Sequence, residues 1–97
     1  MLGENNKQRR TLDVGFGNTV PLNRVIGIVS YESHPMKRHC QELDKMRRII
    51  DATKGRKVKS VIFLDSSHAV LSAVARETLA ERFEQATKPL SLTPFSP

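Results

Sequence analysis

Hydrophobic residues recur along this chain in short blocks whose spacing alternates between strand-like and helix-like. Leu12, Val14 and Phe16 alternate with polar or small residues, which predicts a strand with one buried face. The run 25–29 (VIGIV) has apolar residues on both sides of an extended chain, so we predict a central strand covered on both faces. Three further apolar runs predict strands of the same sheet: 49–50, 61–64 and 69–74.

Two other segments have the spacing of three and four residues that is typical of an amphipathic helix. The first begins at a cap formed by Ser33 or His34 with Pro35 in its first turn. Its inward face is predicted to consist of Met36, Cys40, Leu43 and either Met46 or Arg47. The second begins at Glu77 and ends near Ala86, and its inward face consists of Leu79, Ala80 and Phe83.

These elements predict a single small α+β domain over residues 12–86, with a mostly antiparallel sheet and two helices. Residues 1–11 are expected to form a flexible basic arm, and residues 87–97 a Pro-rich tail. Two short helices can shield one face of a sheet, yet three strands are apolar on both faces. We therefore expect a second copy of the chain to cover the other face.

Composition narrows the class of protein further. The 97 residues contain a single cysteine, Cys40, which excludes an internal disulfide and fits a reducing compartment. No apolar run approaches the roughly 20 residues of a membrane span, and the first residues do not resemble a secretory signal. We expect a cytoplasmic protein with no membrane partner and no small-molecule substrate.

Positive charge is concentrated in residues 45–59, which contain seven cations and one carboxylate and so carry the +6 net charge of the whole chain. The centre of this stretch predicts a turn, because Gly55 adopts a positive φ at little cost. Dense cations at a turn favour a polyanion as partner, although a solvated loop that aids solubility is the alternative. The candidate nucleic-acid-binding residues are Arg24, Lys54, Arg56, Lys57 and Lys59. We expect Arg24 to lie beside Arg56, either within one chain or across a subunit interface, so that the two guanidinium groups bind successive phosphates.

Other candidate chemistry is weaker. The sequence GFGN at 15–18 lacks the third glycine and the helix of a dinucleotide-binding loop, so its glycines are expected to serve a tight turn. The loop 65–68 (DSSH) has the residue types of a hydrolytic triad, but these are adjacent in sequence instead of being brought together from separate elements. His39 and Cys40 point about 100° apart on a helix, with no further ligand nearby. We expect no metal, no cofactor and no enzymatic activity.

The ordered motifs of the chain resemble the RemA family of bacterial extracellular-matrix regulators. The resemblance covers residues 12 to about 83, and its motifs are GFGN at 15–18, NR at 23–24, IVS at 28–30, ES at 32–33, IDAT at 50–53, GR at 55–56 and LSAV at 71–74. It implies a LytTR-like fold, assembly into a ring-shaped homo-oligomer, binding to duplex DNA in the nucleoid, and activation of biofilm-matrix genes. Arg24 and Arg56 match the family's DNA-binding positions. Lys57 stands where the family usually has a second arginine, and Lys54 stands where it usually has tyrosine.

Two alternatives from other classes remain open at this point. The same cations could bind RNA, since the low aromatic content disfavours single-stranded loops but not A-form helices. Alternatively, the chain could form a structural ring that recruits a protein partner through the Pro-rich tail.

Overall fold

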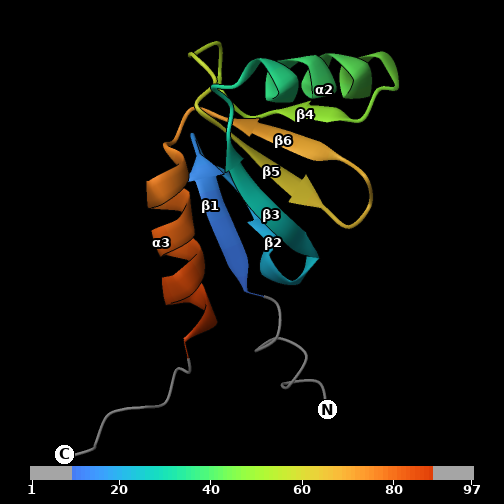
Figure 1. Cartoon of the computed structure of the whole chain (residues 1–97). Helices are drawn as coiled ribbons and strands as arrows, with labels where there is room; N and C mark the ends of the chain where they lie inside the picture. The colour runs from blue at the N-terminus through green and yellow to red at the C-terminus, as the bar shows by residue number, and fades with distance from the viewer. Residues whose placement is uncertain (1–9, 89–97) are drawn as a thin grey trace, which may run out of the picture.

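The structure is a computed structural model that describes residues 10–88 (Figure 1). In chain order its elements are β1 (Thr11–Gly15), β2 (Asn18–Pro21), the 3-10 helix η1 (Leu22–Arg24), β3 (Val25–Ser30), α2 (His34–Lys45), β4 (Ile49–Asp51), β5 (Ser60–Leu64), β6 (Ala69–Ser72) and α3 (Arg76–Thr87). The α+β class with two α-helices and mostly antiparallel strands is confirmed. No helix of the described part is long and apolar enough to cross a membrane.

The predictions of an arm and a tail fall mainly on residues 1–9 and 89–97, which lie outside the described residues. The last two residues of the expected arm belong to the fold. Thr11 begins β1, and the guanidinium of Arg10 donates to the carbonyls of Ala86 and Lys88, each over 2.8 Å.

Helix α2 begins as the sequence predicts. Ser33 is its N-cap, and the Ser33 hydroxyl accepts a hydrogen bond from the Met36 N–H over 3.1 Å. Cys40 and Leu43 are buried on the inward face. The predicted continuation of this face to Met46 or Arg47 is wrong, because both lie beyond the last turn and are exposed, Met46 with 57% of its surface.

The main sheet has the strand order β3-β5-β6-β4. Strand β4 runs parallel to β6, whereas the other two pairs are antiparallel, and β1 and β2 form a separate hairpin. The prediction that residues 25–29 form a central strand is therefore wrong, because β3 lies at an edge. Its sequence is apolar on both sides because Ile28 packs in the cluster beneath α3 and Val29 packs in the cluster beneath α2.

The two helices cover opposite faces of this sheet. Alternate residues of β5 show this, because Val61 packs with the inward residues of α2 while Ile62 packs with α3 and the β1–β2 hairpin. Figure 1 shows α3 beside β1 and far from α2. The expectation that both helices cover one face, and that a second copy must cover the other, is therefore wrong: the N-terminal hairpin joins α3 in covering its face.

Gly15 allows the hairpin to lie close to the segment that follows β6. Its φ is +104°, and a Cβ there would lie 2.9 Å from the Val74 Cγ2 atom, whereas Gly17 has a φ of +79° with open space around it.

Gly17→Ala is expected to lower the free energy of unfolding by about 1–2 kcal/mol through backbone strain alone. Gly15→Ala should cost about 1–3 kcal/mol more, because the added methyl also overpacks. Urea unfolding of both variants checks this, and equal losses would contradict the close approach to Val74.

Candidate nucleic-acid interface

The basic turn, which we define as residues 54–59, connects β4 to β5 at one end of the sheet (Figure 1). Its tip is tight: the Arg56 N–H donates to the Thr53 carbonyl over 3.0 Å, and both residues between them have positive φ, +54° at Lys54 and +80° at Gly55. Two consecutive left-handed residues are typical of a type I′ turn. The predicted turn at Gly55 is confirmed, and the strained residue beside it is a lysine.

The base of the turn is fixed by Asp51 and Thr53. The Asp51 Oδ1 atom accepts hydrogen bonds from the Thr53 hydroxyl over 2.6 Å and from the Thr53 N–H over 2.9 Å. These bonds, the hydroxyl bond first, hold the pKa of the Asp51 carboxyl below its usual value of 3.8. Thr53 itself is only 2% exposed. The Asp51 carboxylate therefore remains charged, and it bonds to Thr53 at the base of the turn instead of pairing with the cations of residues 54–59.

Phe16 positions the side chain of Arg56. The structure places Phe16 in the β1–β2 turn with a φ of +55° and 45% of its surface exposed, so its predicted place on the buried strand face is wrong. The Arg56 Cζ atom lies 5.3 Å from the centroid of the Phe16 ring, which is a cation–π contact. The glycines of GFGN serve a tight turn as expected, since Gly15 and Gly17 both have positive φ. The sequence does not reveal the contact of Phe16 with Arg56. The alternation of apolar and polar residues in β1 continues through Phe16, so it does not show that the strand ends at Gly15.

A hollow of about 440 Å³ lies between the basic turn, the β1–β2 turn and the segment after β6. The residues that line it include Phe16, Arg56, Lys57, Lys59 and Val74, and none of its lining residues is acidic. Two buried serines hold its floor together. The Ser60 hydroxyl donates to the Val74 carbonyl over 2.6 Å, and the Ser72 hydroxyl donates to the Val14 carbonyl over 2.8 Å. The cations therefore project from a floor whose buried polar groups are satisfied.

A second hollow of about 430 Å³ lies on the other side of Lys57 and Lys59. It differs in charge, since Glu32 and Glu77 also line it. An anion approaching this side meets both signs of charge, whereas the hollow beside Phe16 presents only cations. Lys54, Arg56, Lys57 and Lys59 are all exposed, and within residues 10–88 none of them forms an ion pair with a carboxylate. The hollow beside Phe16 is therefore the better anion site.

Arg24 lies apart from the basic turn. It precedes Val25, which pairs with Leu64, whereas the opposite end of β3, at Ser30, pairs with Ser60 beside the basic turn. Five residues of extended chain separate the two ends, or roughly 17 Å. The prediction that Arg24 and Arg56 are neighbours is therefore wrong within one chain. Arg24 is also partly neutralised, because its Nη1 atom lies 3.3 Å from the Asp65 Oδ1 atom.

The cationic stretch 45–59 is divided between the two ends of the sheet as well. Lys45 ends α2 and Arg48 precedes β4, where the Arg48 guanidinium donates to the Ser66 carbonyl over 3.4 Å in the β5–β6 loop. Strand β4 then carries the chain to the basic turn at the other end. The excess charge is therefore concentrated in sequence but not in space: one group lies near Arg24 and the other is the basic turn.

The remaining candidate chemistry has structural roles. Cys40 is 4% exposed, and burial raises the pKa of its thiol. In the loop between β5 and β6, the Ser66 hydroxyl and His68 Nδ1 lie 2.9 Å apart, but Asp65 bonds to Arg24 instead of continuing a triad. No group of three His, Cys, Asp or Glu side chains within residues 10–88 could hold a metal ion.

Residues 11–83 match the RemA-like family, described as extracellular matrix regulatory protein A-like. A protein of Oleidesulfovibrio alaskensis is 47% identical over 79 residues, which are 81% of this chain and 94% of that protein. A protein of Gloeothece citriformis is 53% identical over 72 residues (74% and 82%), and one of Halalkalibacterium halodurans is 51% identical over 73 residues (75% and 84%). Each of the three bears the name "Putative regulatory protein".

The Asp51–Thr53 bonds give a test of the base of the turn. Thr53→Val removes the hydroxyl donor, so the pKa of Asp51 should rise toward 3.8, as measured by NMR titration of its carboxyl group. Because the folded-state pKa is lowered, the stability from Asp51 is present above about pH 4 and is lost as the pH falls through the folded value. Thr53→Val should shrink this acid-dependent loss. Thr19→Val, at an exposed strand position, is the control, and an unchanged Asp51 titration in Thr53→Val would contradict the assignment.

Proposed function

The chain belongs to the RemA-like family, and from that premise we propose that it is a DNA-binding transcriptional regulator that acts as a ring-shaped homo-oligomer. The family and the names of its relatives support a regulatory role. The proposal assigns duplex DNA as the partner, the nucleoid as the place of action, and genes of the extracellular matrix as the targets. The last assignment rests on the family's description alone.

The observation that carries the proposal is the charge at the basic turn. Lys54, Arg56, Lys57 and Lys59 are exposed and, among the described residues, form no ion pair, and three of them line a hollow without a carboxylate. Arg56 is held over Phe16, so less of its rotamer freedom is lost on binding. A guanidinium positioned in this way suits the oxygens of a backbone phosphate, to which it can donate two hydrogen bonds.

One turn alone would bind weakly. Three or four cations give a non-specific dissociation constant of about 10⁻⁴–10⁻⁶ M at physiological salt. Several copies in one assembly convert later contacts into intramolecular ones, which adds a factor of about 10²–10⁴ in avidity. Self-association is therefore part of the proposed mechanism, because it turns a weak phosphate contact into a useful one.

Selectivity would come mainly from the shape of the DNA. The basic turn contributes lysines, which act as point charges, and one arginine, and such contacts to phosphates fix position without reading base edges. Phosphate-binding turns repeated around a ring favour duplexes that bend at low cost, and bendability depends on sequence. The regulator would thus act by shaping the promoter.

Arg56→Ala tests the proposal directly. Duplex affinity measured against salt should weaken, and the slope of log K against log [salt] should become shallower by about 1 for each Arg56 that contacts a phosphate. The oligomer mass of the same samples should not change. Lys45→Ala removes one positive charge at the other end of the sheet and should have a smaller effect. Equal effects of the two variants, or binding that ignores salt, would contradict an interface at the basic turn.

Competition between nucleic acids tests the choice of DNA. Duplex DNA should displace a labelled duplex at lower concentration than duplex RNA of matching sequence, since the proposal assigns the turns to B-form backbone. RNA that competes as well as DNA would overturn the DNA assignment and favour an RNA-binding module with the same cations.

Asp65→Asn tests whether Arg24 also contacts DNA. Removing the carboxylate releases Arg24 from its ion pair, so duplex affinity should rise and the salt slope should steepen by up to about 1 per contacting copy. In the Arg24→Ala background the gain should disappear. A gain that persists without Arg24 would reflect general charge, and Arg24 would then not be a DNA contact.

A further inference from the structure

The main sheet has two outer strands, β3 and β4, and both direct backbone groups away from the sheet. On β3, the Tyr31 N–H donates inward to the Lys59 carbonyl, so by the two-residue period the groups of Ile28 and Ser30 point outward. On β4, the Arg48 carbonyl and the Ala52 N–H bond to β6, so the groups of Ile49 and Asp51 point outward. Open edges of this kind are templates for pairing with another chain.

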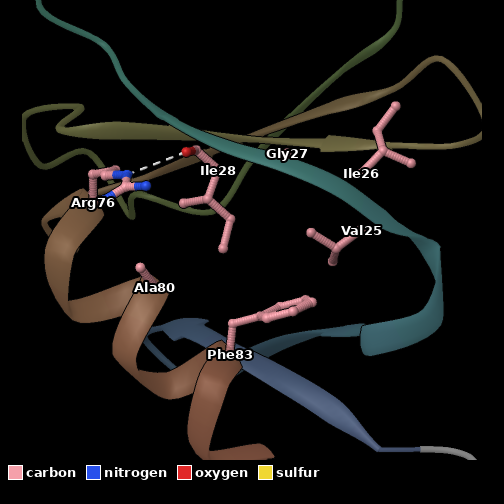
Figure 2. Close-up of a pocket in the computed structure, with 7 residues that line it drawn as sticks. All are labelled: Val25, Ile26, Gly27, Ile28, Arg76, Ala80 and Phe83. Atoms are coloured by element: carbon pink, nitrogen blue, oxygen red, sulfur yellow. Dashed lines mark hydrogen bonds between the residues drawn. The ribbon is translucent and has the colours of Figure 1, made fainter. Parts of the chain in front are cut away.

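At each of these two edges, one face of the outer strand is not covered by a helix or by the hairpin. Ile26 of β3 is 70% exposed, and Figure 2 shows it pointing away from α3. It therefore lies on the face of the sheet that α2 covers farther along. Ile50 of β4 is 46% exposed and shares the opposite face with its neighbour Val70, whose cluster α3 covers. Each edge therefore leaves one isoleucine uncovered, and the two lie on opposite faces.

Groups that could cover each isoleucine lie at the other edge. Between β3 and α3 is a groove of about 270 Å³. Its lining includes Val25, Ile28, Ala80 and Phe83, which point into it together, and Arg76 at one end (Figure 2). This groove lies on the same face as Ile50. At the end of α2, Met46 is 57% exposed and lies on the same face as Ile26. The apolar groups at the β4 edge therefore match those at the β3 edge, whereas neither edge matches a second copy of itself.

We propose that β4 of one copy pairs with β3 of the next, in parallel, so that the sheet continues from chain to chain. This inference rests on the self-association in the proposed function and names the surfaces that produce it. Ile50 of one copy enters the groove beside Phe83 of its neighbour, and Met46 covers the neighbour's Ile26. The pairing replaces the contact of Arg76, whose exposed side chain donates to the Ile28 carbonyl over 3.3 Å.

The strand directions make this pairing repeatable. Strand β3 is antiparallel to β5, β5 is antiparallel to β6, and β6 is parallel to β4, so β3 and β4 point the same way. A β3–β4 contact uses two different surfaces and is heterologous, so it can repeat around a closed ring. Because every copy keeps the same strand direction, all basic turns gather at one end of the assembly and the Arg24 side chains gather at the other.

The test uses two variants, each with one edge blocked. Ile26→Asp blocks the β3 edge and Ile50→Asp blocks the β4 edge, and both positions are exposed, so the fold should persist. Light scattering at micromolar concentration should give each variant the mass of one chain, 10.9 kDa. An equimolar mixture should give twice that mass, because one intact β4 edge and one intact β3 edge remain. Gln41→Asp, at an exposed position of α2, should retain the mass of the wild type.

Each other outcome overturns the edge pairing. Assembly lost in Ile26→Asp but retained in Ile50→Asp would indicate pairing of two β3 edges. Wild-type mass in both variants would place the interface elsewhere. Two monomeric variants with wild-type circular dichroism that fail to combine would exclude a heterologous contact.

The proposed function fails separately from this inference. A wild-type chain that stays monomeric while binding DNA tightly would overturn ring assembly before any edge variant is made. With the inference correct, the monomeric edge variants should lose about 10²-fold or more in duplex affinity. Arg56→Ala should lose affinity with its mass unchanged, so the two causes are distinguishable.

Discussion

Burial of the β5–β6 pair on both faces is the constraint on which the rest of the structure depends. Val61 and Ile62 are adjacent and both fully buried, so the two sides of the sheet need separate apolar layers. The chain meets this need with α2 on one side and with α3 and a hairpin on the other. Each layer is narrower than the sheet, so one strand at each edge keeps an exposed isoleucine. The surface that we assign to self-association thus arises from the way the core is covered.

The end of the sheet that carries the basic turn combines a rigid base with exposed cations. Ser60 and Ser72 are fully buried, and their hydroxyl groups tie the hairpin and the segment after β6 to the strand ends. Asp51 and Thr53 fix the start of the turn in the same way. A phosphate-binding site benefits from this arrangement, since the backbone that presents the lysines is already ordered before a polyanion arrives.

The helices and most strands were predictable from the sequence, whereas the order of strands in the sheet and the face that each helix covers were not. Period-two and helical spacing located β1, the four strands of the main sheet and both helices, and Ser33 marked the start of α2. Apolar residues on both sides of a strand indicate two covered faces but not two neighbouring strands, so β3 was wrongly placed at the centre. The density of cations along the sequence likewise does not show which of them lie close together in the folded chain. Strand β4 separates Arg48 from Lys54, and β3 separates Arg24 from the basic turn, so residues expected to cooperate lie at opposite ends. Phe16 was missed because the alternation of β1 gives no signal that the strand ends at Gly15.

The irregular pairing of β3 has a consequence for the curvature of any larger assembly. Between Val25 and Gly27 the register with β5 shifts, so Ile26 is an extra residue in the edge strand. Such a bulge bends its strand and increases the local twist. In a sheet that continues through β3, this bend recurs once per copy and adds a fixed rotation between neighbours. The number of copies needed to complete a full turn would then be set by backbone geometry at a single residue, and a shift of that irregularity would change the diameter of the assembly without altering any of its basic side chains.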